Sequence, residues 1–596
     1  MNLPFPKRKR PFLYCALFIL LLSLFLFHHE KENIRFVRFC RTMFCQDLVC
    51  NTINLHYTLE CPWKYGILQV PPVLPVYTPD TRENSQSQIQ QRARTLSTIS
   101  PEKLSPTNQY TYQLLSRKLQ LQQKKLPYFY LDEPLSPSSG MHQTLPILLS
   151  EYRFEEERDV ENYLALLSQI DSYFRGLLLF EEEKAEKGYF MSKDSSLTVA
   201  SQCAGFLTEE SIQNNQHFLV TSFVERLSKL QEKGHLSSQK AEQYVERNKE
   251  LLRTQVLPAY TSLAQEMTRL ATSKKAPQQA RGLSHYPLGQ EYYALLIKEE
   301  TGCYKEPAQI GDLLWGKFQS AISECKSLGT ASDPAALEKM SPEEMLTLLK
   351  TATEKDFPPF PSTGTGFWKK IKGESSLSCD IKTISSSLAE KAAPAFYLIP
   401  PIDSHNNNVI YLNPNSQLDG ISLFTTLAHE GYPGHLYQTI YTQKSGIYPL
   451  TNPIRSILNY EGYAEGWAFY VEQKSYDFAA RHTDASFEQE KASRELSLCL
   501  CALMDFHIHY YDLSYEQCLS FLAPLGFNET QARQLYQYIA EEPCSYLKYY
   551  LSYLEILALQ EQARLLWQEQ YSDASFYQFY LDAGPSDFIA LWSLLK

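Results

Sequence analysis

Two histidines and a glutamate, His429, Glu430 and His435, lie within seven residues in the stretch LFTTLAHEGYPGHLYQ. The apolar positions 423, 424 and 427 before them have the spacing of one helix face, so we expect a helix to lead into the group. Imidazole nitrogens bind zinc, and a glutamate beside the first histidine can take a proton from water that the metal activates. These residue types therefore indicate a metal site with a general base.

The separation of the two histidines differs from that in the well-known zinc-peptidase motif, where they are four residues apart on one helix. Here His435 follows six residues after His429, which places it off the same face of a regular helix. Pro433-Gly434 lies between them and breaks or bulges a helix, so we expect it to bring His435 back to the same ion. The alternative is a helix that ends at the Pro-Gly pair, with histidines that bind nothing.

A second group of acids follows in the segment NYEGYAEGWAFYVEQ, residues 459–473. On a helix, Glu461, Glu465 and Glu472 fall within about 40° of one another. The aromatic residues around them indicate burial, and buried carboxylates need a cation or hydrogen-bond donors. We expect one of them to be a third zinc ligand and another to orient the histidines. The alternative is a solvated acidic helix face.

The segments HEGYPGH and EGWAFYVE together resemble the bacterial family catalogued as domain of unknown function 885, a group of predicted zinc metallopeptidases. Its patterns are H-E-x-x-P-G-H and E-G-W-A-x-Y-x-E, and the likeness runs from about residue 100 onward. The resemblance implies that His429, His435 and Glu465 bind one zinc ion and that Glu430 is the general base. The E-x6-E spacing of Glu465 and Glu472 is also similar to the ligand segment of the thermostable carboxypeptidase family, which favours Glu465 over Glu461.

Two later segments resemble the same family. DFHIH, residues 505–509, is similar to its D-x-G-x-H segment, and PCSYLKYYLSYLE, residues 543–555, to its P-G-Q-x-x-x-Y-x-x-G segment. The resemblance implies that His509 and Tyr549, with Tyr546 as a neighbouring candidate, donate hydrogen bonds to the oxyanion of the tetrahedral intermediate. A packing role is the alternative for either tyrosine, because the chain has 40 of them.

Four positions in these later segments depart from the family pattern. His507 and Ser552 each replace a glycine, and Cys544-Ser545 replaces Gly-Gln. The backbone conformation of the family therefore does not carry over to these positions.

Two short runs of β-forming residues, 395–399 and 409–412, stand just before the expected metal helix. The turn PPIDSHNNN joins them, which predicts a hairpin. An edge strand has free N–H and C=O groups that could pair with an extended peptide substrate. A purely structural hairpin is the alternative.

Long amphipathic stretches dominate the rest of the chain, so we expect a mainly α fold with a small β-hairpin or sheet beside the metal helix. A helical, metallopeptidase-like catalytic domain is expected over residues 108–596. A Pro/Ser/Gln-rich linker, from 71 to 107, is expected to precede it. The amphipathic stretches are at 108–125, 156–187, 209–233, 240–272 and 292–301.

The N-terminal region predicts the compartment. A basic cluster at 7–10 precedes an uncharged run at 11–27, without a small-x-small cleavage site after it. We therefore expect residues 1–30 to form an uncleaved signal-anchor, with one transmembrane helix and an extracytoplasmic catalytic domain. A cleaved signal peptide and a hydrophobic helix of a soluble domain are the alternatives.

Four cysteines, Cys40, Cys45, Cys50 and Cys61, lie within 22 residues after the expected anchor. In an extracytoplasmic segment, such a cluster favours one or two disulfides. Their gaps of 5, 5 and 11 do not match the C-x2-C spacing of zinc knuckles, so a metal cluster is the less favoured alternative.

The net charge of −11 is spread over glutamate-rich helices, which disfavours a nucleic-acid partner. The combined prediction is a membrane-anchored zinc peptidase with a peptide substrate; no signal sets an oligomeric state. The alternatives are a non-catalytic surface binding module on a peptidase scaffold and a zinc hydrolase of non-peptide amides. The presence of Glu430 beside both histidines favours an enzyme over a binding module, since binding alone needs no base.

Overall fold

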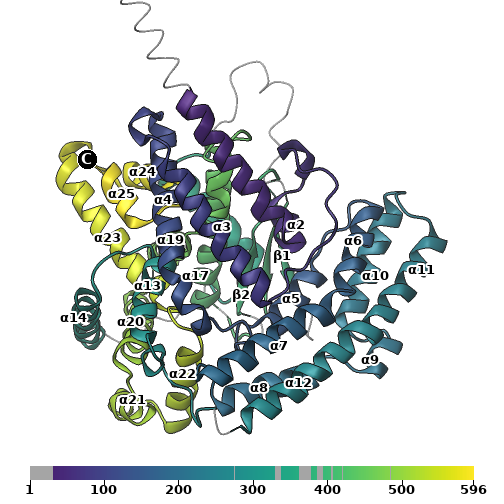
Figure 1. Cartoon of the computed structure of the whole chain (residues 1–596). Helices are drawn as coiled ribbons and strands as arrows, with labels where there is room; N and C mark the ends of the chain where they lie inside the picture. The colour runs from purple at the N-terminus through teal and green to yellow at the C-terminus, as the bar shows by residue number, and fades with distance from the viewer. Residues whose placement is uncertain are drawn as a thin grey trace, which may run out of the picture.

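The computed structural model describes residues 31–273, 276–328, 337–361, 378–384, 393–404, 407–418, 420–483 and 485–595. These residues form a mainly helical protein with one small mixed sheet, which confirms the mainly α part of the predicted fold class and its small sheet (Figure 1). The predicted anchor at 11–27 lies outside the described residues. Within the described ranges, no helix is long and apolar enough to cross a membrane.

The first layer of the protein packs around its own apolar cluster, which includes Phe36, Phe44 and Leu114. Residues 79–97, where composition predicted a linker, form a helix because Thr78 caps its first turn and Pro79 occupies the first position. The layer consists of the N-terminal helix (residues 31–49), α2 (Thr52–Thr58), α3 (Pro79–Ser97) and α4 (Pro106–Lys125).

The expected disulfides among the four N-terminal cysteines are wrong, because all four thiols are free. Cys40, Cys45 and Cys50 lie along the N-terminal helix and the turn that ends it. Steps of five residues turn a helix by about 140°, so successive thiols point in different directions. Cys40 is buried in the apolar cluster and Cys50 is exposed. The metal-cluster alternative is not supported either, since among the described residues the group with metal-binding geometry lies elsewhere.

A second layer of helices encloses another apolar cluster, which includes Leu149, Phe174 and Tyr260. The predicted stretch 156–187 forms two helices, α6 and α7, whereas 240–272 is continuously helical, with a π-helical segment (Leu252–Val256) between α11 and α12. The layer consists of α5 (Met141–Ser150), α6 (Glu157–Leu167), α7 (Ile170–Lys187), α8 (Lys193–Ala204), α9 (Glu209–Gln213), α10 (Phe218–Glu232), α11 (Ser238–Leu251) and α12 (Leu257–Ala271).

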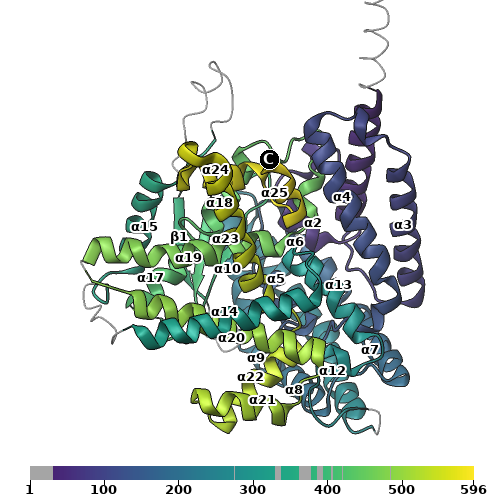
Figure 2. The same cartoon turned by 90° about the vertical axis from the view of Figure 1, so that its left-hand side faces the viewer.

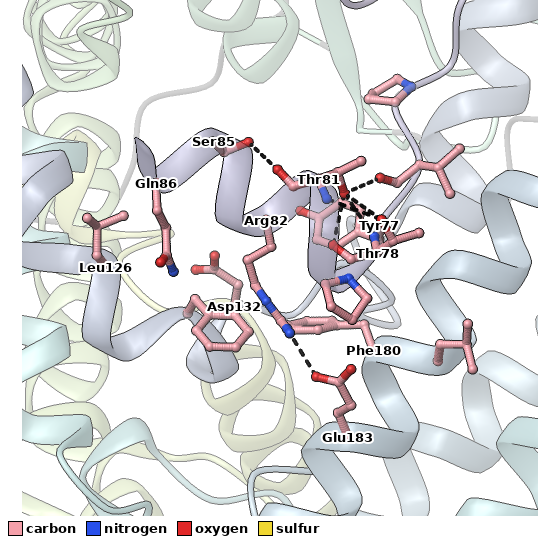
Figure 3. A pocket seen from close by; sticks show the side chains of 15 residues that line it. Tyr77, Thr78, Thr81, Arg82, Ser85, Gln86, Leu126, Asp132, Phe180 and Glu183 are labelled. Carbon is pink, nitrogen blue, oxygen red and sulfur yellow. Dashed lines mark hydrogen bonds and ion pairs between the residues drawn. The ribbon is translucent and has the colours of Figure 1, made fainter. Parts of the chain in front are cut away.

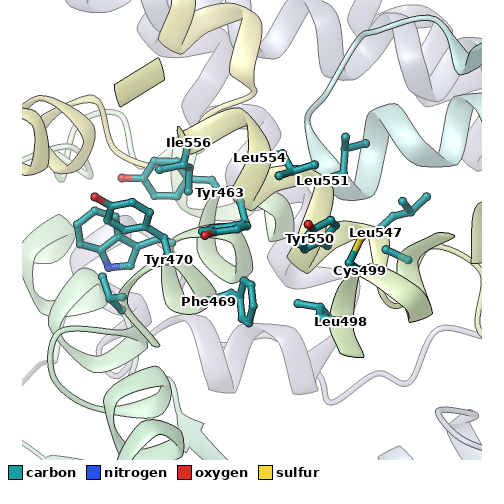
Figure 4. Packing of buried hydrophobic residues seen from close by; sticks show 14 of the residues in the cluster. Tyr463, Phe469, Tyr470, Leu498, Cys499, Leu547, Tyr550, Leu551, Leu554 and Ile556 are labelled. Carbon is teal, nitrogen blue, oxygen red and sulfur yellow. The ribbon is translucent and has the colours of Figure 1, made fainter. Parts of the chain in front are cut away.

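The largest apolar cluster belongs to the C-terminal half, where α19, α20 and α23 pack closely (Figure 2). Tyr463, Tyr470 and Leu551 are among the buried side chains between these helices (Figure 4). The helices of this half are α13 (Gly289–Thr301), α14 (Pro307–Ser327), α15 (Pro342–Asp356), α17 (Gly420–Glu430), α18 (His435–Lys444), α19 (Glu461–Thr483), α20 (Glu488–Tyr511), α21 (Tyr515–Leu522), α22 (Glu529–Glu541), α23 (Leu547–Trp567), α24 (Asp573–Ala583) and α25 (Phe588–Leu594).

The sheet has the order β1-β3-β2. Strands β2 (Ala395–Leu398) and β3 (Asn407–Leu412) pair antiparallel, with Ala395 opposite Leu412, so the predicted hairpin is confirmed. Strand β1 (Ser378–Thr383) pairs parallel to β3 and was not predicted, because its sequence SCDIKT is largely polar and exposed. Strand β2 is left at an edge of the sheet.

Candidate metal centre

The turn between α17 and α18 brings the two histidines together. Helix α17 ends at Glu430 and α18 begins at His435, so four residues, 431–434, form the turn between them. A Cβ on Gly434 would lie 1.8 Å from the carbonyl oxygen of His429, so only glycine fits this close approach. Trp467 on α19 donates its indole N–H to the Pro433 carbonyl at 2.9 Å. The His429 and His435 ring centroids are 4.9 Å apart, as the Pro-Gly pair predicted.

Helix α19 places a carboxylate against both rings. The Oε2 atom of Glu465 lies 3.5 Å from Nε2 of His429 and 3.3 Å from Nε2 of His435. This oxygen is buried, and within the described part of the chain it forms no hydrogen bond. A buried carboxylate oxygen without a hydrogen bond destabilises the folded state. A metal ion bound by this oxygen and the two Nε2 atoms would remove that cost.

Glu430 lies beside the same rings but is held differently. Its carboxylate, His429 and His435 form a group whose possible ligand atoms lie within 4.8 Å of one another. However, Oε2 of Glu430 accepts a hydrogen bond of 2.8 Å from the backbone N–H of Tyr397 on β2. Since one oxygen of Glu430 is already occupied, Glu465 is the better candidate for the carboxylate ligand. Glu430 remains close enough to act on a molecule held there.

The other nitrogen of His429 has its own partner. Nδ1 of His429 lies 3.0 Å from Oε2 of Glu472, and Arg494 on α20 donates from Nε to Oε1 of Glu472 at 2.6 Å. This bond turns Nε2 of His429 toward Glu465, since Nδ1 must carry the proton that Glu472 accepts. Arg494 in turn compensates the buried charge of Glu472.

The charges around His429 favour a cation. Burial alone would lower the pKa of His429, but the carboxylates of Glu465, Glu472 and Glu430 together raise it to about 10. Burial would raise the pKa of Glu465, yet both histidines hold it well below its usual range. The site therefore stabilises positive charge at the imidazoles, which either protons or a metal ion can supply. Two imidazoles and a carboxylate are a donor set that zinc accepts, so the residues fit the predicted ion.

Helix α23 packs against α19 at two glycines and brings further side chains to the site. A Cβ on Gly466 would lie 2.7 Å from Cβ of Ser552, and one on Gly462 would lie 2.5 Å from Oγ of Ser552. This close packing places the Tyr549 ring 6.1 Å from the His429 ring. Burial, Glu465 and Glu430 raise the pKa of Tyr549, so its hydroxyl keeps its proton.

The remaining acid of the α19 group, Glu461, faces another partner. Its Oε2 atom accepts a hydrogen bond of 2.7 Å from Nζ of Lys548. Although Glu461 shares a helix face with Glu465, this ion pair ties it to α23, and Asn459 donates to its other oxygen at 3.2 Å. It is thus a neighbour of the ligand group and touches neither histidine.

The structure does not bring His509 to this group. Its Nδ1 atom accepts from the Leu283 N–H at 3.0 Å, and its Nε2 atom lies 2.7 Å from the Ile539 carbonyl. Burial lowers its pKa to about 4, so it is a neutral core residue with both nitrogens used. We therefore assign His509 no role in catalysis.

The segment around Asp505 serves to hold the start of α23. The buried Asp505 carboxylate accepts from the backbone N–H groups of Cys544 and Tyr546, both at 3.1 Å, and from the Tyr293 hydroxyl at 2.7 Å. These bonds fix the chain three residues before Tyr549. Tyr546 contributes its backbone here, while Tyr549 lies nearer to the metal group.

The structure shows what two of the departures from the family pattern do to their surroundings. Cys544 replaces a glycine and adopts a φ of 66°, a left-handed conformation that glycine takes more easily. Ser552 also replaces a glycine, and its hydroxyl donates to the Thr301 carbonyl at 3.0 Å. His507 is half-buried beside Phe506 and Tyr511, and the structure gives no reason for it.

Two supporting residues could not be found in the sequence. Tyr397 acts through its backbone N–H, which has no side-chain signature. Arg494 lies 22 residues after Glu472 in an ordinary charged stretch, KASRELS, and only the packing of α20 on α19 brings it there.

A separate cavity of about 420 Å³ lies between α3, α7 and the segment 126–132 (Figure 3). Its wall is mainly apolar, and an ion pair of 3.0 Å between Arg82 and Glu183 crosses its edge. None of its lining residues belongs to the metal group, so we place the chemistry at the histidines instead.

Comparisons with known proteins agree with this fold. The family described as "Bacterial protein of unknown function (DUF885)" matches residues 66–586. No curated protein sequence matches the chain. A crystal structure of a Colwellia psychrerythraea protein described as a putative lipoprotein has a TM-score of 0.78 at 19% identity, covering 95% of this chain and 98% of that one. A Shewanella oneidensis protein, described as a putative lipoprotein of unknown function, has a TM-score of 0.59 at 14% identity, covering 94% and 99%.

Proposed function

The chain belongs to the DUF885 family of bacterial proteins, and from its metal centre we propose that it is a zinc-dependent peptidase. One observation carries this proposal. A buried, otherwise unbonded carboxylate oxygen of Glu465 lies between Nε2 atoms of His429 and His435, while the Glu430 carboxylate beside them is held by a separate donor. This is the division into ligands and base that metal-assisted hydrolysis needs.

His429, His435 and Glu465 would hold the ion. When bound, zinc polarises a carbonyl and lowers the pKa of a water molecule toward about 7. Glu472 keeps Nε2 of His429 directed at the site, and Arg494 keeps Glu472 ionised.

Glu430 would act as the general base and then as the general acid. With Oε2 fixed by the Tyr397 N–H, its other oxygen is free to take a proton from the attacking water. The same carboxyl can then return the proton to the amine that leaves when the peptide bond breaks.

Tyr549 is the group that would stabilise the oxyanion. Its raised pKa keeps the phenol a hydrogen-bond donor at neutral pH, as that role requires. Strand β2 lies at the edge of the sheet, where Glu430 occupies the outward N–H of Tyr397, and the other outward backbone groups of the strand would pair with an extended peptide.

We place the enzyme at a bacterial membrane with its catalytic part outside the cytoplasm. Two structural relatives are described as putative lipoproteins, and the apolar run at 11–27 follows a basic cluster. Both observations favour attachment through the N-terminal region. A lipoprotein is attached by a lipid-modified cysteine, whereas an apolar run is attached as a transmembrane helix. Mass spectrometry of the intact N-terminus from purified membranes distinguishes a retained anchor from a lipid-modified cysteine.

The proposed function is tested by metal analysis and a peptide-library digest of the purified full-length chain. We expect about one zinc per chain and cleavage products that disappear after chelation and return with added zinc. Zinc without cleavage of any library peptide would favour the binding-module alternative. Hydrolysis of simple amides alone would favour the non-peptide hydrolase.

The first prediction concerns Tyr549. We expect Tyr549→Phe to keep its zinc and its KM but to lose on the order of 10²-fold in kcat, because the hydroxyl acts mainly in the transition state. Steady-state kinetics with metal analysis measures this. The control is Tyr538→Phe, a half-exposed tyrosine on α22, which should change kcat little. A larger effect on KM than on kcat would contradict the oxyanion role.

The second prediction concerns the backbone donor to Glu430. We expect Tyr397→Pro to have a kcat about 10-fold or more below that of Tyr397→Ala, because a hydrogen bond to a charged group contributes about 1.5–3 kcal/mol. Both variants lose the same buried ring, and only the proline loses the N–H, which faces away from β3 and is not part of the ladder. Equal kcat values, with equal zinc contents, would show that this bond does not position the base.

The third prediction concerns Glu472. We expect Glu472→Ala to weaken zinc binding by about 10–100-fold, because His429 loses the partner that fixes its ring. Competition with a fluorescent zinc chelator measures the affinity. Glu461→Ala on the same helix face is the control, since Glu461 pairs with Lys548 and touches neither histidine. An unchanged zinc affinity in Glu472→Ala would contradict the orienting role.

A further inference from the structure

The N-terminal helix carries an exposed basic face. Lys31, Ile34 and Arg38 lie within about 60° of one another around the helix and are all exposed. Ile34 is 52% exposed, although Phe36 and Cys40 on the opposite face are completely buried. One side of the helix is therefore apolar and packs against the protein. The opposite side is basic, carries one isoleucine and faces outward.

A neighbouring segment extends this face with exposed apolar side chains. In the segment 62–68, Tyr65 and Ile67 point into the protein, whereas Trp63 is 65% exposed and Leu68 is 76% exposed. Lys64 lies between them with its Nζ atom 5.8 Å from the centre of the Trp63 ring. Arg41 of the N-terminal helix donates to the Tyr65 carbonyl at 3.2 Å, which fastens the segment beside the helix.

We propose that this N-terminal basic surface, made of Lys31, Ile34, Arg38, Trp63, Lys64 and Leu68, lies on an anionic lipid bilayer. The mixture of cations with an exposed tryptophan and aliphatic side chains is the composition of an interfacial membrane contact. Basic side chains are attracted to anionic headgroups, and tryptophan favours the headgroup level.

The charge of the surface is not cancelled by its neighbours. Glu32 pairs with Arg35 at 3.7 Å and is mostly covered, and Glu60 is the exposed acid at the edge of the segment. The half-buried Asp403 also lies beside the segment, where both of its carboxylate oxygens accept backbone N–H groups, from Glu60 at 2.7 Å and from Cys61 at 2.9 Å. The exposed cations Lys31, Arg38, Arg41 and Lys64 thus outnumber these acids.

The position of the surface along the chain favours a membrane over a soluble partner. Three residues, 28–30, lie between the end of the apolar run at Phe27 and Lys31, and a fully extended chain spans these four steps in about 14 Å at most. Wherever that run enters a bilayer, the N-terminal helix begins within reach of its surface. Figure 2 shows this helix with α3 and α4 along one edge of the molecule, which leaves its outer face free to approach a plane.

Tryptophan quenching in nanodiscs tests the contact with the full-length chain. The discs contain phosphatidylglycerol with brominated phosphatidylcholine, and bromine quenches tryptophans that enter the headgroup or acyl region. We expect brominated discs to quench part of the emission relative to unbrominated discs, and Trp63→Phe to abolish that part. The matched control is Trp315→Phe, because Trp315 is 43% exposed on α14, away from the N-terminal helix in both views (Figures 1 and 2).

Two further variants separate lipid contact from a change in folding. Leu68→Trp in the Trp63→Phe background should restore the quenching, since Leu68 shares the surface. Replacing Lys31, Arg38 and Lys64 together with glutamine should reduce the quenching in anionic discs. Quenching that is unchanged in Trp63→Phe, or a chain that does not stay with the discs, would overturn the proposal. An unquenched Trp63 that nucleic acid or a second protein protects would assign the surface to that partner instead.

Discussion

Replacing Glu430 with glutamine should leave zinc content and folding nearly unchanged while kcat falls by about 10²–10⁴-fold. The amide keeps the shape of the carboxylate, and its oxygen can still accept the hydrogen bond from the Tyr397 N–H. It cannot take a proton from water and return it to the leaving amine. Single-turnover rates and metal analysis on the same preparation measure the two properties together.

The contrast with Glu465→Gln makes this test specific. The Glu465 oxygen lies between the two Nε2 atoms, so we expect this variant to lose most of its zinc. Glu430, however, also lies within metal-binding distance of both histidines. If Glu430→Gln lost the zinc and Glu465→Gln kept it, the roles of ligand and base would have to be exchanged. A parental rate in zinc-loaded Glu430→Gln would contradict the hydrolytic mechanism.

His435→Ala should reduce the zinc content from about one per chain to a small fraction, because two protein ligands hold the ion far more weakly than three. The loss of zinc binding should also remove the stabilisation that bound zinc gives to the folded state. A ligand at 100 times its Kd stabilises the folded state by about 2.7 kcal/mol, so added zinc should raise the Tm of the parent and leave that of the variant unchanged.

An exposed histidine provides the control for this variant. His482 lies near the end of α19, is exposed and belongs to no metal group among the described residues. His482→Ala should bind zinc and respond to it as the parent does. Parental zinc content in His435→Ala would mean that the turn between α17 and α18 does not deliver this histidine to the ion.

Local spacing in the sequence determined most of the secondary structure and the candidate ligands of this protein. The 3.6-residue period of apolar positions predicted helices, and the β-forming runs around 395–412 predicted the hairpin, because both depend on neighbours along the chain. The break at Pro433-Gly434 and the shared face of Glu465 and Glu472 also follow from short-range geometry. For the same reason, the ligand candidates could be named before the fold was known.

Only the tertiary structure decided which long-range partners these residues have. His509 matched a motif, yet packing placed it between the Leu283 N–H and the Ile539 carbonyl, because its helix turns that face into the core. The cysteines were close in sequence, but a helix points them apart. Arg494 and the Tyr397 N–H reach the site through contacts between distant elements, and no spacing along the chain encodes such contacts. The choice of Glu465 over Glu430 as the ligand likewise rests on a distant contact. Tyr397, 33 residues before Glu430, donates its backbone N–H to one oxygen of Glu430, whereas the buried oxygen of Glu465 faces only the imidazoles.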